Sequence, residues 1–181
     1  MSRRCVSVYR DRVRTIRVPL PSGRRRGAAT DVLLVCSTGG HLLQLLALRP
    51  VWETRRRLWV THANSDAKSL LRDEHVEYAY YPTTRNVWNL ARNLILACRV
   101  IARHRPRVLV TTGAGVAVPF AWAARLYGTR VVYVESLTRV GGLSLSARLI
   151  APIADRLYVQ WPELARVHAR AEYHGNLLHV E

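Results

Sequence analysis

Residues 32–48 read VLLVCSTGGHLLQLLAL and hold one complete strand–turn–helix unit. The continuous apolar run at 32–36 is typical of a strand buried on both faces, as parallel sheets require. Gly39 and Gly40 form the predicted turn, and a helix follows over residues 41–48. This stretch therefore predicts a buried strand whose carboxyl end opens onto a glycine turn and the start of a helix.

The same alternation of strands and helices continues along the chain. We expect further strands at 57–61, 76–81, 108–112, 130–134 and 156–160, and helices at 65–72, 86–104, 116–127 and 143–150. The pattern predicts an α/β fold with a single Rossmann-like, doubly wound parallel sheet. Ligands of such sheets bind beyond the carboxyl ends of the strands. Segments 37–41, 112–115 and 135–142 would then lie together at this edge of the sheet, which we call the rim.

Positive charge is abundant and unevenly distributed, with a formal net charge of +16. Residues 1–27 hold nine arginines, one aspartate and no periodic apolar face. We therefore predict a basic, disordered arm over residues 1–30 and one domain over residues 31–181. Residues 78–134 contain eight arginines and no acidic residue. Such an excess of positive charge attracts nucleic acid, anionic lipid or a diphosphate substrate. The sign of the charge alone does not show which of these binds.

The predicted helix at 86–104 combines basic and apolar residues. Arg85, Arg92 and Arg99 recur every seven residues and therefore lie along one face. A basic amphipathic helix can lie among lipid headgroups; the alternative is an ordinary surface helix whose apolar side covers the sheet. No run reaches the 18 or so apolar residues of a membrane span. The cysteines and histidines lack metal-ligand spacing, so we expect no metal.

Candidate binding residues follow three of the predicted strands. Gly39 and Gly40 allow close backbone approach, and the helix start after them offers free N–H groups to an anion. The alternative there is a tight turn with an exposed His41. Small residues after the fourth strand let the following helix pack close to the sheet and leave space for a substrate. Glu135 ends an apolar strand, where a carboxylate either faces a ligand or forms an ion pair, for instance with Arg139 or Arg148.

The sequence after this strand is distinctive. Residues 135–146 read ESLTRVGGLSLS, residues 151–155 read APIAD and residues 159–164 read VQWPEL. Together with segments 37–41 and 112–115, they resemble the membrane-associated subunit of the two-subunit N-acetylglucosaminyltransferase of dolichol-linked oligosaccharide synthesis. They are also similar to bacterial exopolysaccharide glycosyltransferase subunits of that family. The resemblance covers about residues 31 to 178.

The peptidoglycan lipid-intermediate glycosyltransferase has a similar glutamate at this strand end. Its N-terminal Rossmann-like domain takes a lipid-linked acceptor, and its C-terminal domain takes the nucleotide sugar. The resemblance therefore implies that this chain is equivalent to the N-terminal half of a GT-B glycosyltransferase. A two-domain enzyme needs about twice the 181 residues present, so we expect the donor site on a separate partner.

The implied function is that of an acceptor-binding, membrane-recruiting subunit, inactive without a donor-binding glycosyltransferase subunit. The implied reaction moves a sugar from a UDP-sugar, bound mainly by the partner, to a polyprenyl-diphosphate-linked saccharide. It would take place at the cytoplasmic face of the membrane, with peripheral attachment. The resemblance implies no cofactor and no metal.

The resemblance and the residues together suggest roles in this reaction. His41 is the first candidate base, because imidazole titrates near neutral pH. Glu135 is the second candidate, or it binds an acceptor hydroxyl. The residues expected to bind the acceptor and its diphosphate are Gly39, Gly40, Gly113, Gly115 and Arg139.

Two other interpretations stay open at this point. The chain could be a scaffold that docks the partner on the membrane and supplies no catalytic group. It could also bind nucleic acid through its arginines. That second interpretation lacks a recognised motif and aromatic residues interleaved with basic ones on a strand face. We therefore expect no nucleic-acid partner.

Overall fold

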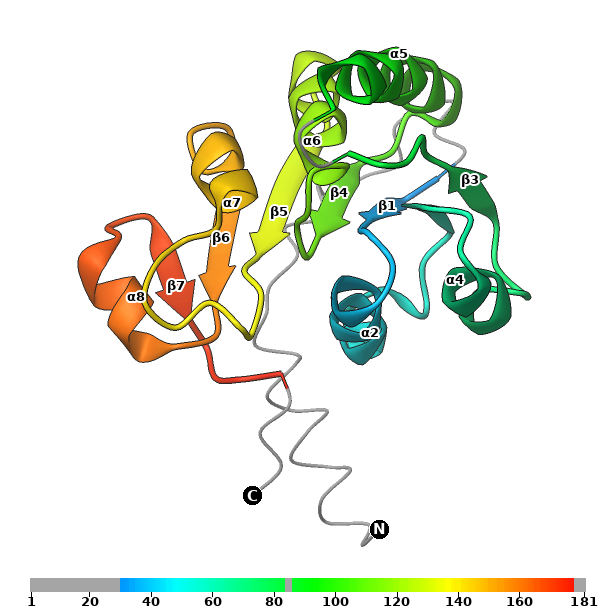
Figure 1. The fold of residues 1–181 in the computed structure, drawn as a ribbon. Coiled ribbons are helices and arrows are strands. Elements are labelled where there is room, and N and C mark those ends of the chain that lie inside the picture. The colour runs from blue at the N-terminus through cyan, green and yellow to red at the C-terminus, as the bar shows by residue number, and fades with distance from the viewer. Residues whose placement is uncertain (1–29, 84–85, 178–181) are drawn as a thin grey trace, which may run out of the picture.

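Seven parallel strands form one sheet in the order β3-β2-β1-β4-β5-β6-β7 (Figure 1). The computed structural model describes residues 30–83 and 86–177. The predicted basic arm, apart from Thr30, and Arg85 lie outside the described residues. The strands are β1 (Val32–Val35), β2 (Arg57–Thr61), β3 (Val76–Tyr78), β4 (Val108–Thr111), β5 (Arg130–Val134), β6 (Arg156–Val159) and β7 (Ala171–Tyr173).

Helices cover both faces of the sheet, which confirms the doubly wound prediction. They are α2 (Gly40–Ala47), α3 (Arg49–Trp52), α4 (Ser65–Leu70), α5 (Val87–His104), α6 (Ala117–Leu126), α7 (Leu145–Ile150) and α8 (Pro162–Val167). Figure 1 shows α2 and α4 on one face, α5, α6 and α7 on the other, and α8 beside β7. Because α2 follows β1 and α6 follows β4 on opposite faces, the topological switch point lies between these two central strands.

Two hydrophobic cores sandwich the sheet, and β1 contributes to both. Leu33 and Val35 belong to the core under α5, α6 and α7, whereas Val32 and Leu34 belong to the core with α2 and α3. All four side chains are buried, because β1 lies between β2 and β4 in the sheet and a hydrophobic core covers each of its faces. The apolar run in the sequence therefore reflects burial on both faces.

The sequence prediction was incomplete in the short elements. It missed α3, α8 and β7, and it extended the strand that begins at Val76 to residue 81, whereas β3 ends at Tyr78. The helix predicted from 143 begins at Leu145, with the Ser144 hydroxyl accepting from the Ala147 N–H at the cap. Sequence alternation is weak in these short elements, because their residues are partly exposed.

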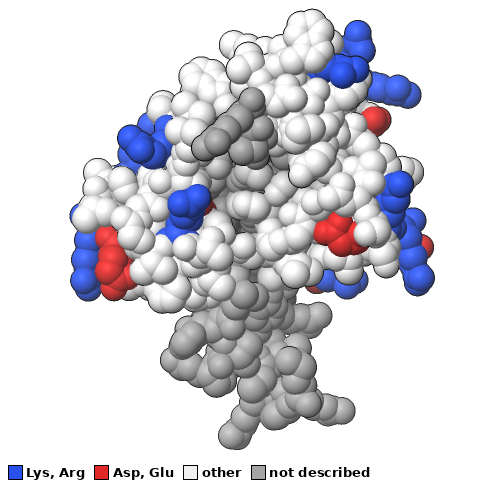
Figure 2. Space-filling model, in the orientation of Figure 1, with Lys and Arg blue, Asp and Glu red and all other residues white. Residues whose placement is uncertain are grey.

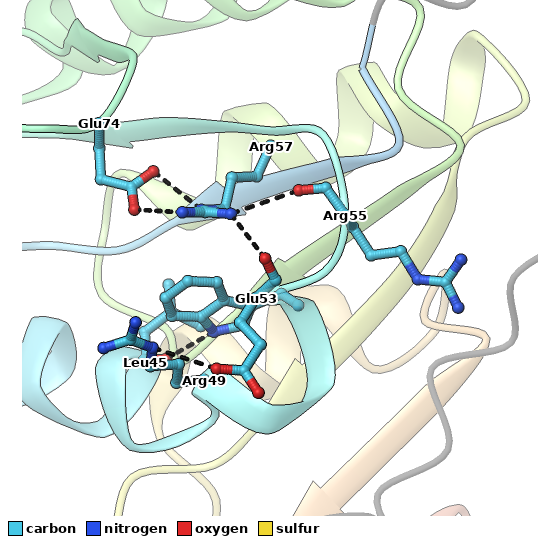
Figure 3. A network of polar contacts seen from close by, with 7 residues as sticks. Leu45, Arg49, Glu53, Arg55, Arg57 and Glu74 are labelled. Carbon is cyan, nitrogen blue, oxygen red and sulfur yellow. Dashed lines mark hydrogen bonds and ion pairs between the residues drawn. The ribbon is translucent and has the colours of Figure 1, made fainter.

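The amino-terminal edge of the sheet is held by an arginine at the start of β2 (Figure 3). Arg57 Nε and Nη2 donate to the two Glu74 carboxylate oxygens at 2.8 and 2.6 Å. Its Nη1 donates to the carbonyls of Glu53 and Arg55 at 2.9 and 3.4 Å. The guanidinium also lies 5.1 Å from the ring centre of Trp52. This bidentate pair ties the turn before β2 to the segment before β3.

Replacing Glu74 with glutamine should lower the free energy of unfolding by about 1 to 2 kcal/mol, since a partly buried charged hydrogen bond is lost. Asp73→Asn is the matched control, because the Arg72–Asp73 pair is exposed at 80% and 87%, and it should change stability by less than about 0.5 kcal/mol. Urea denaturation with an unchanged m-value checks both. Equal midpoints for the two variants would contradict the stabilising role of the Arg57–Glu74 pair.

Candidate functional site

The start of α2 presents open backbone at the carboxyl end of β1. Gly39 has φ 72°, a left-handed conformation that favours glycine. A Cβ added to Gly39 or Gly40 would meet no atom within 4 Å, so space beside the turn is free. The first helical amides have no intrahelical acceptor and carry the positive end of the helix dipole. This arrangement suits an anionic group of a ligand.

An acidic residue holds this turn, which the sequence did not suggest. The Gly39 N–H donates to Asp66 Oδ2 at 2.8 Å, and Asp66 lies in the first turn of α4. The Asn64 side-chain amide adds a 3.2 Å bond to Thr38 Oγ1. The turn is therefore fixed by the segment after β2. An anion would have to bind at the amides after Gly39, because Asp66 already accepts from that residue.

His41 lies at the switch point and is bound to the loop after β4. Its Nδ1 is 2.7 Å from the Thr112 carbonyl oxygen, and the Thr112 hydroxyl donates to the His41 carbonyl oxygen at 2.7 Å. A carbonyl oxygen only accepts, so Nδ1 carries the proton. In the neutral ring Nε2 then has a free lone pair, and it makes no hydrogen bond to any described residue. The half-buried side chain is thus oriented as a base would need.

The glycines after β4 are packed against other side chains. Gly113 has φ 104°, and a Cβ there would collide with the Tyr133 hydroxyl. A Cβ on Gly115 would lie 3.0 Å from Thr83 Oγ1. Both positions therefore need glycine to let neighbouring groups approach. The structure thus shows close packing at both glycines, whereas the space for a substrate and their role in acceptor binding stay predictions.

Glu135 is fully buried at the end of β5. Its Oε1 accepts from the Ser136 N–H and its Oε2 from the Ser144 N–H, both at 2.7 Å. The carboxylate thus closes the base of the loop between β5 and α7. Among the described residues it forms no ion pair with Arg139 or Arg148, the two partners considered from the sequence. Two occupied oxygens favour a positioning role for Glu135 over proton transfer.

Tyr133 lies beneath this loop. Its hydroxyl is 3.1 Å from Ser144 Oγ and 3.2 Å from Ser146 Oγ. Burial raises the pKa of Tyr133 to about 12, and the negative charge of Glu135 adds to the rise. The phenol therefore stays neutral at physiological pH and keeps a proton to donate within the serine cluster.

Two buried glutamines join the loops of the rim. The Gln44 side-chain oxygen accepts from the Leu137 N–H and from Gln160 Nε2, both at 2.9 Å. Gln160 Nε2 also donates to the Glu135 carbonyl at 2.9 Å, and its oxygen accepts from the Leu177 N–H at 3.0 Å. Gln44 was missed from the sequence. It stands three residues after His41 in an apolar run. Its polarity at a predicted core position was the only signal in the sequence that could have revealed it.

Arg139 lies in the same loop with its side chain exposed. Its N–H donates to the Ser136 carbonyl at 3.0 Å, which makes a tight turn at the loop tip. Its guanidinium forms no ion pair with any described residue. The rim thus brings together the β1, β4, β5 and β6 loops that carry His41, Gly113, Glu135 and Gln160.

A pocket of about 570 Å³ lies at the edge of the sheet opposite the rim. Its lining includes Arg55, Arg56, Arg57, Glu74 and His104. Much of its charge is neutralised within the protein, since Arg57 pairs with Glu74 and Arg56 with Asp31. Parallel sheets bind ligands at the carboxyl ends of their strands, so we favour the rim. Within residues 30–83 and 86–177, no three His, Cys, Asp or Glu side chains gather to hold a metal.

Comparison with known families fits this geometry. Residues 72–177 match the family model described as "Oligosaccharide biosynthesis protein Alg14 like". The chain belongs to the Alg14-like family. That match contains β4, β5, β6 and the loops after them, which supply Thr112, Glu135 and Gln160 to the rim.

Curated relatives of this Alg14-like chain bear the name "UDP-N-acetylglucosamine transferase subunit ALG14". The one from Eremothecium gossypii is 32% identical over 87% of this chain and 84% of that protein. The one from Yarrowia lipolytica is 41% identical, but that match covers 54% of this chain and only 47% of the relative. The one from Rattus norvegicus is 25% identical over 81% of this chain and 82% of its own length.

Solved structures show the same fold. The Alg14-like chain matches MurG of Acinetobacter baumannii with a TM-score of 0.66 and 17% identity, over 79% of this chain and 45% of that one. It matches a UDP-N-acetylglucosamine 2-epimerase from Rickettsia bellii with a TM-score of 0.64 and 12% identity, over 82% of this chain and 45% of that one. The chain therefore has the fold of less than half of each of these larger proteins.

Replacing Glu135 with glutamine should destabilise the protein by about 1 to 3 kcal/mol, because one buried N–H loses its acceptor. Amide hydrogen exchange at Ser136 and Ser144 should speed up more than exchange in the β1 core. Glu77→Gln is the matched control, since the Glu77 carboxylate forms no hydrogen bond or ion pair with any described residue. Unchanged exchange at both serines in the Glu135 variant would contradict the anchoring role.

Proposed function

We propose that this chain is the acceptor-binding and membrane-recruiting subunit of a heteromeric glycosyltransferase. The enzyme would move a sugar from a UDP-sugar to a polyprenyl-diphosphate-linked saccharide. Membership of the Alg14-like family and the names of the relatives support a transferase subunit. The observation that carries the proposal is His41 Nε2, a free acceptor beside the open amides at the start of α2. A donor-binding partner would supply most of the UDP-sugar site.

The geometry supports a direct displacement. His41 Nε2 takes the proton from an acceptor hydroxyl while that oxygen forms a bond to the anomeric carbon of the donor sugar. The bond from this carbon to the diphosphate breaks, and UDP leaves with the electron pair. The helix-start amides are suited to the diphosphate of the acceptor, and Arg139 is exposed at the same rim. Glu135 keeps the rim loop in place.

Exchanging His41 for asparagine tests the base without removing the contact to Thr112, since an asparagine amide can still donate to that carbonyl. Transfer of radiolabelled UDP-N-acetylglucosamine to polyprenyl-diphosphate acceptors is measured with the chain alone, the donor-binding subunit alone and both together. We expect activity only in the mixture, lowered about a hundredfold or more by His41→Asn.

Two controls belong to this experiment. His75→Asn changes an exposed histidine before β3 and should leave transfer unchanged. Co-purification of the His41 variant with the donor-binding subunit shows that assembly is intact. Near-normal transfer by His41→Asn would remove His41 from the chemistry, and activity of the donor-binding subunit alone would reduce this chain to a scaffold.

The outer face of α5 supports recruitment to a membrane surface. Ala97, Val100 and Ile101 cover the sheet, whereas Val87 and Trp88 are exposed at 79% and 74% at the helix start. The helix thus covers the sheet as an ordinary surface helix does, and in addition it leaves two large apolar side chains exposed at its start. Figure 2 shows mostly uncharged surface over α5 and α6, with basic residues at its margin. Amphipathic helices of this kind lie in the headgroup region.

The basic residues of α5 add an electrostatic attraction. Arg92 and Arg99 are exposed on this helix, and the Arg92 guanidinium also lies 4.2 Å from the ring centre of Tyr80. Anionic lipids attract such groups at roughly 1 kcal/mol per residue near the surface. Within the described residues, no helix is both long and apolar enough to cross a bilayer. We therefore propose a peripheral contact through α5.

Binding to vesicles that contain anionic lipid should weaken about tenfold or more in the double variant Val87→Ser, Trp88→Ser, because two exposed apolar side chains no longer enter the interface. The control is Val167→Ser, since Val167 is 70% exposed on α8, and it should bind like the parent chain. Vesicle co-sedimentation at low and high salt measures both. Equal affinity of all three proteins would exclude α5 as the contact.

A further inference from the structure

A second, smaller pocket opens at the carboxyl ends of β6 and β7. Its volume is about 230 Å³, and its lining residues come from the β6–α8 turn and from the segment after β7. They are Gln160, Trp161, Pro162, Glu163, Tyr173 and Asn176. Pockets for drug-sized ligands span roughly 300 to 1,000 Å³, so this one suits a single small ring. The catalytic proposal above does not use it.

Two aromatic side chains line the pocket. The Trp161 indole N–H donates to the Leu137 carbonyl at 2.7 Å, which fixes the orientation of the ring while leaving it half-buried. Tyr173 is exposed at 41%. Aromatic faces bind the C–H face of a sugar ring well, because they bury a large apolar area at low entropic cost and keep a polar edge.

The polar groups of the pocket favour hydroxyls over an anion. Glu163 is exposed and forms no hydrogen bond or ion pair with any described residue. By contrast, Glu74, Asp155 and Glu172 each pair with an arginine. The place of Glu163 in the first turn of α8 stabilises that helix, yet it also adds a carboxylate to the pocket wall. A carboxylate repels phosphate and accepts hydrogen bonds from neutral hydroxyl groups.

The pocket wall is built into the same framework as the catalytic rim. Gln160 lines the pocket and donates to Gln44 and to the Glu135 carbonyl. The Trp161 indole holds Leu137 of the loop that follows Glu135. A ligand in the pocket would therefore touch residues that are hydrogen-bonded to the rim. The site is positioned to hold one part of a substrate whose other part lies at α2.

We propose that this pocket is a saccharide subsite that binds one neutral pyranose ring of the acceptor. Trp161 and Tyr173 supply the apolar contact, and Glu163 accepts from ring hydroxyls. The inference rests on the proposed function, because that function provides a saccharide acceptor. The diphosphate would lie at the backbone amides of the α2 start, the reacting hydroxyl at His41, and this one ring in the acidic, aromatic pocket.

The test uses the full chain and free N-acetylglucosamine as the probe. Indole N–H resonances of the five tryptophans are followed by NMR during titration, and Trp161→Phe assigns the relevant signal. We expect a saturable shift confined to the Trp161 resonance. Glu163→Ala should weaken this binding about tenfold, whereas Glu77→Ala, which removes another carboxylate without a described partner, should leave it unchanged.

Three results would overturn the subsite. They are the absence of a saturable Trp161 shift, equal weakening by Glu163→Ala and Glu77→Ala, and loss of co-purification with the donor-binding subunit in Glu163→Ala while sugar affinity is unchanged. The last would make the pocket a protein contact. Failure of the saccharide subsite can be distinguished from failure of the proposed function. Sugar binding without transfer in the mixture refutes the function, and transfer without sugar binding refutes the subsite alone.

Discussion

The buried carboxylate of Glu135 is the constraint on which the rim depends. A charge without solvent is stable only when hydrogen bonds satisfy it, and here both oxygens accept backbone N–H groups at 2.7 Å. One partner comes directly after β5, and the other is the cap residue of α7. The loop between them is therefore closed at its base. The Leu137 carbonyl and the turn at Arg139 belong to this loop, so their positions are fixed as well.

Two glutamines and a histidine extend the constraint across the sheet. Gln44 and Gln160 connect α2, the Glu135 loop and the segment after β7, while His41 and Thr112 exchange two hydrogen bonds between α2 and the β4 loop. Polar side chains supported in this way need little reorganisation when a ligand arrives. The rim is thus prepared before any partner binds. The groups of the rim without a described partner are the Nε2 of His41, the helix-start amides and, in the small pocket, the Glu163 carboxylate.

Sequence patterns predicted the sheet well because buried parallel strands appear as uninterrupted apolar runs, as in residues 32–36. They also located the rim, since glycine turns follow those strands. They failed at β7, whose residues Ala171–Tyr173 are partly exposed and lack such a run. Long-range polar contacts were equally invisible. Nothing local indicates that Gln44 bonds to residues more than ninety positions away, or that Asp66 accepts from Gly39.

Gly113 and Tyr133 are in contact, so the side-chain size allowed at one position depends on the side chain at the other. The phenol occupies the space that any β-carbon at Gly113 would need, and the phenol in turn supports the serines under the Glu135 loop. A larger residue at Gly113 would need a smaller residue at position 133 and would in addition have to adopt the strained φ of 104°. The residues at these two positions are therefore expected to depend on each other as the family diverges, although Gly113 lies in the loop after β4 and Tyr133 in β5.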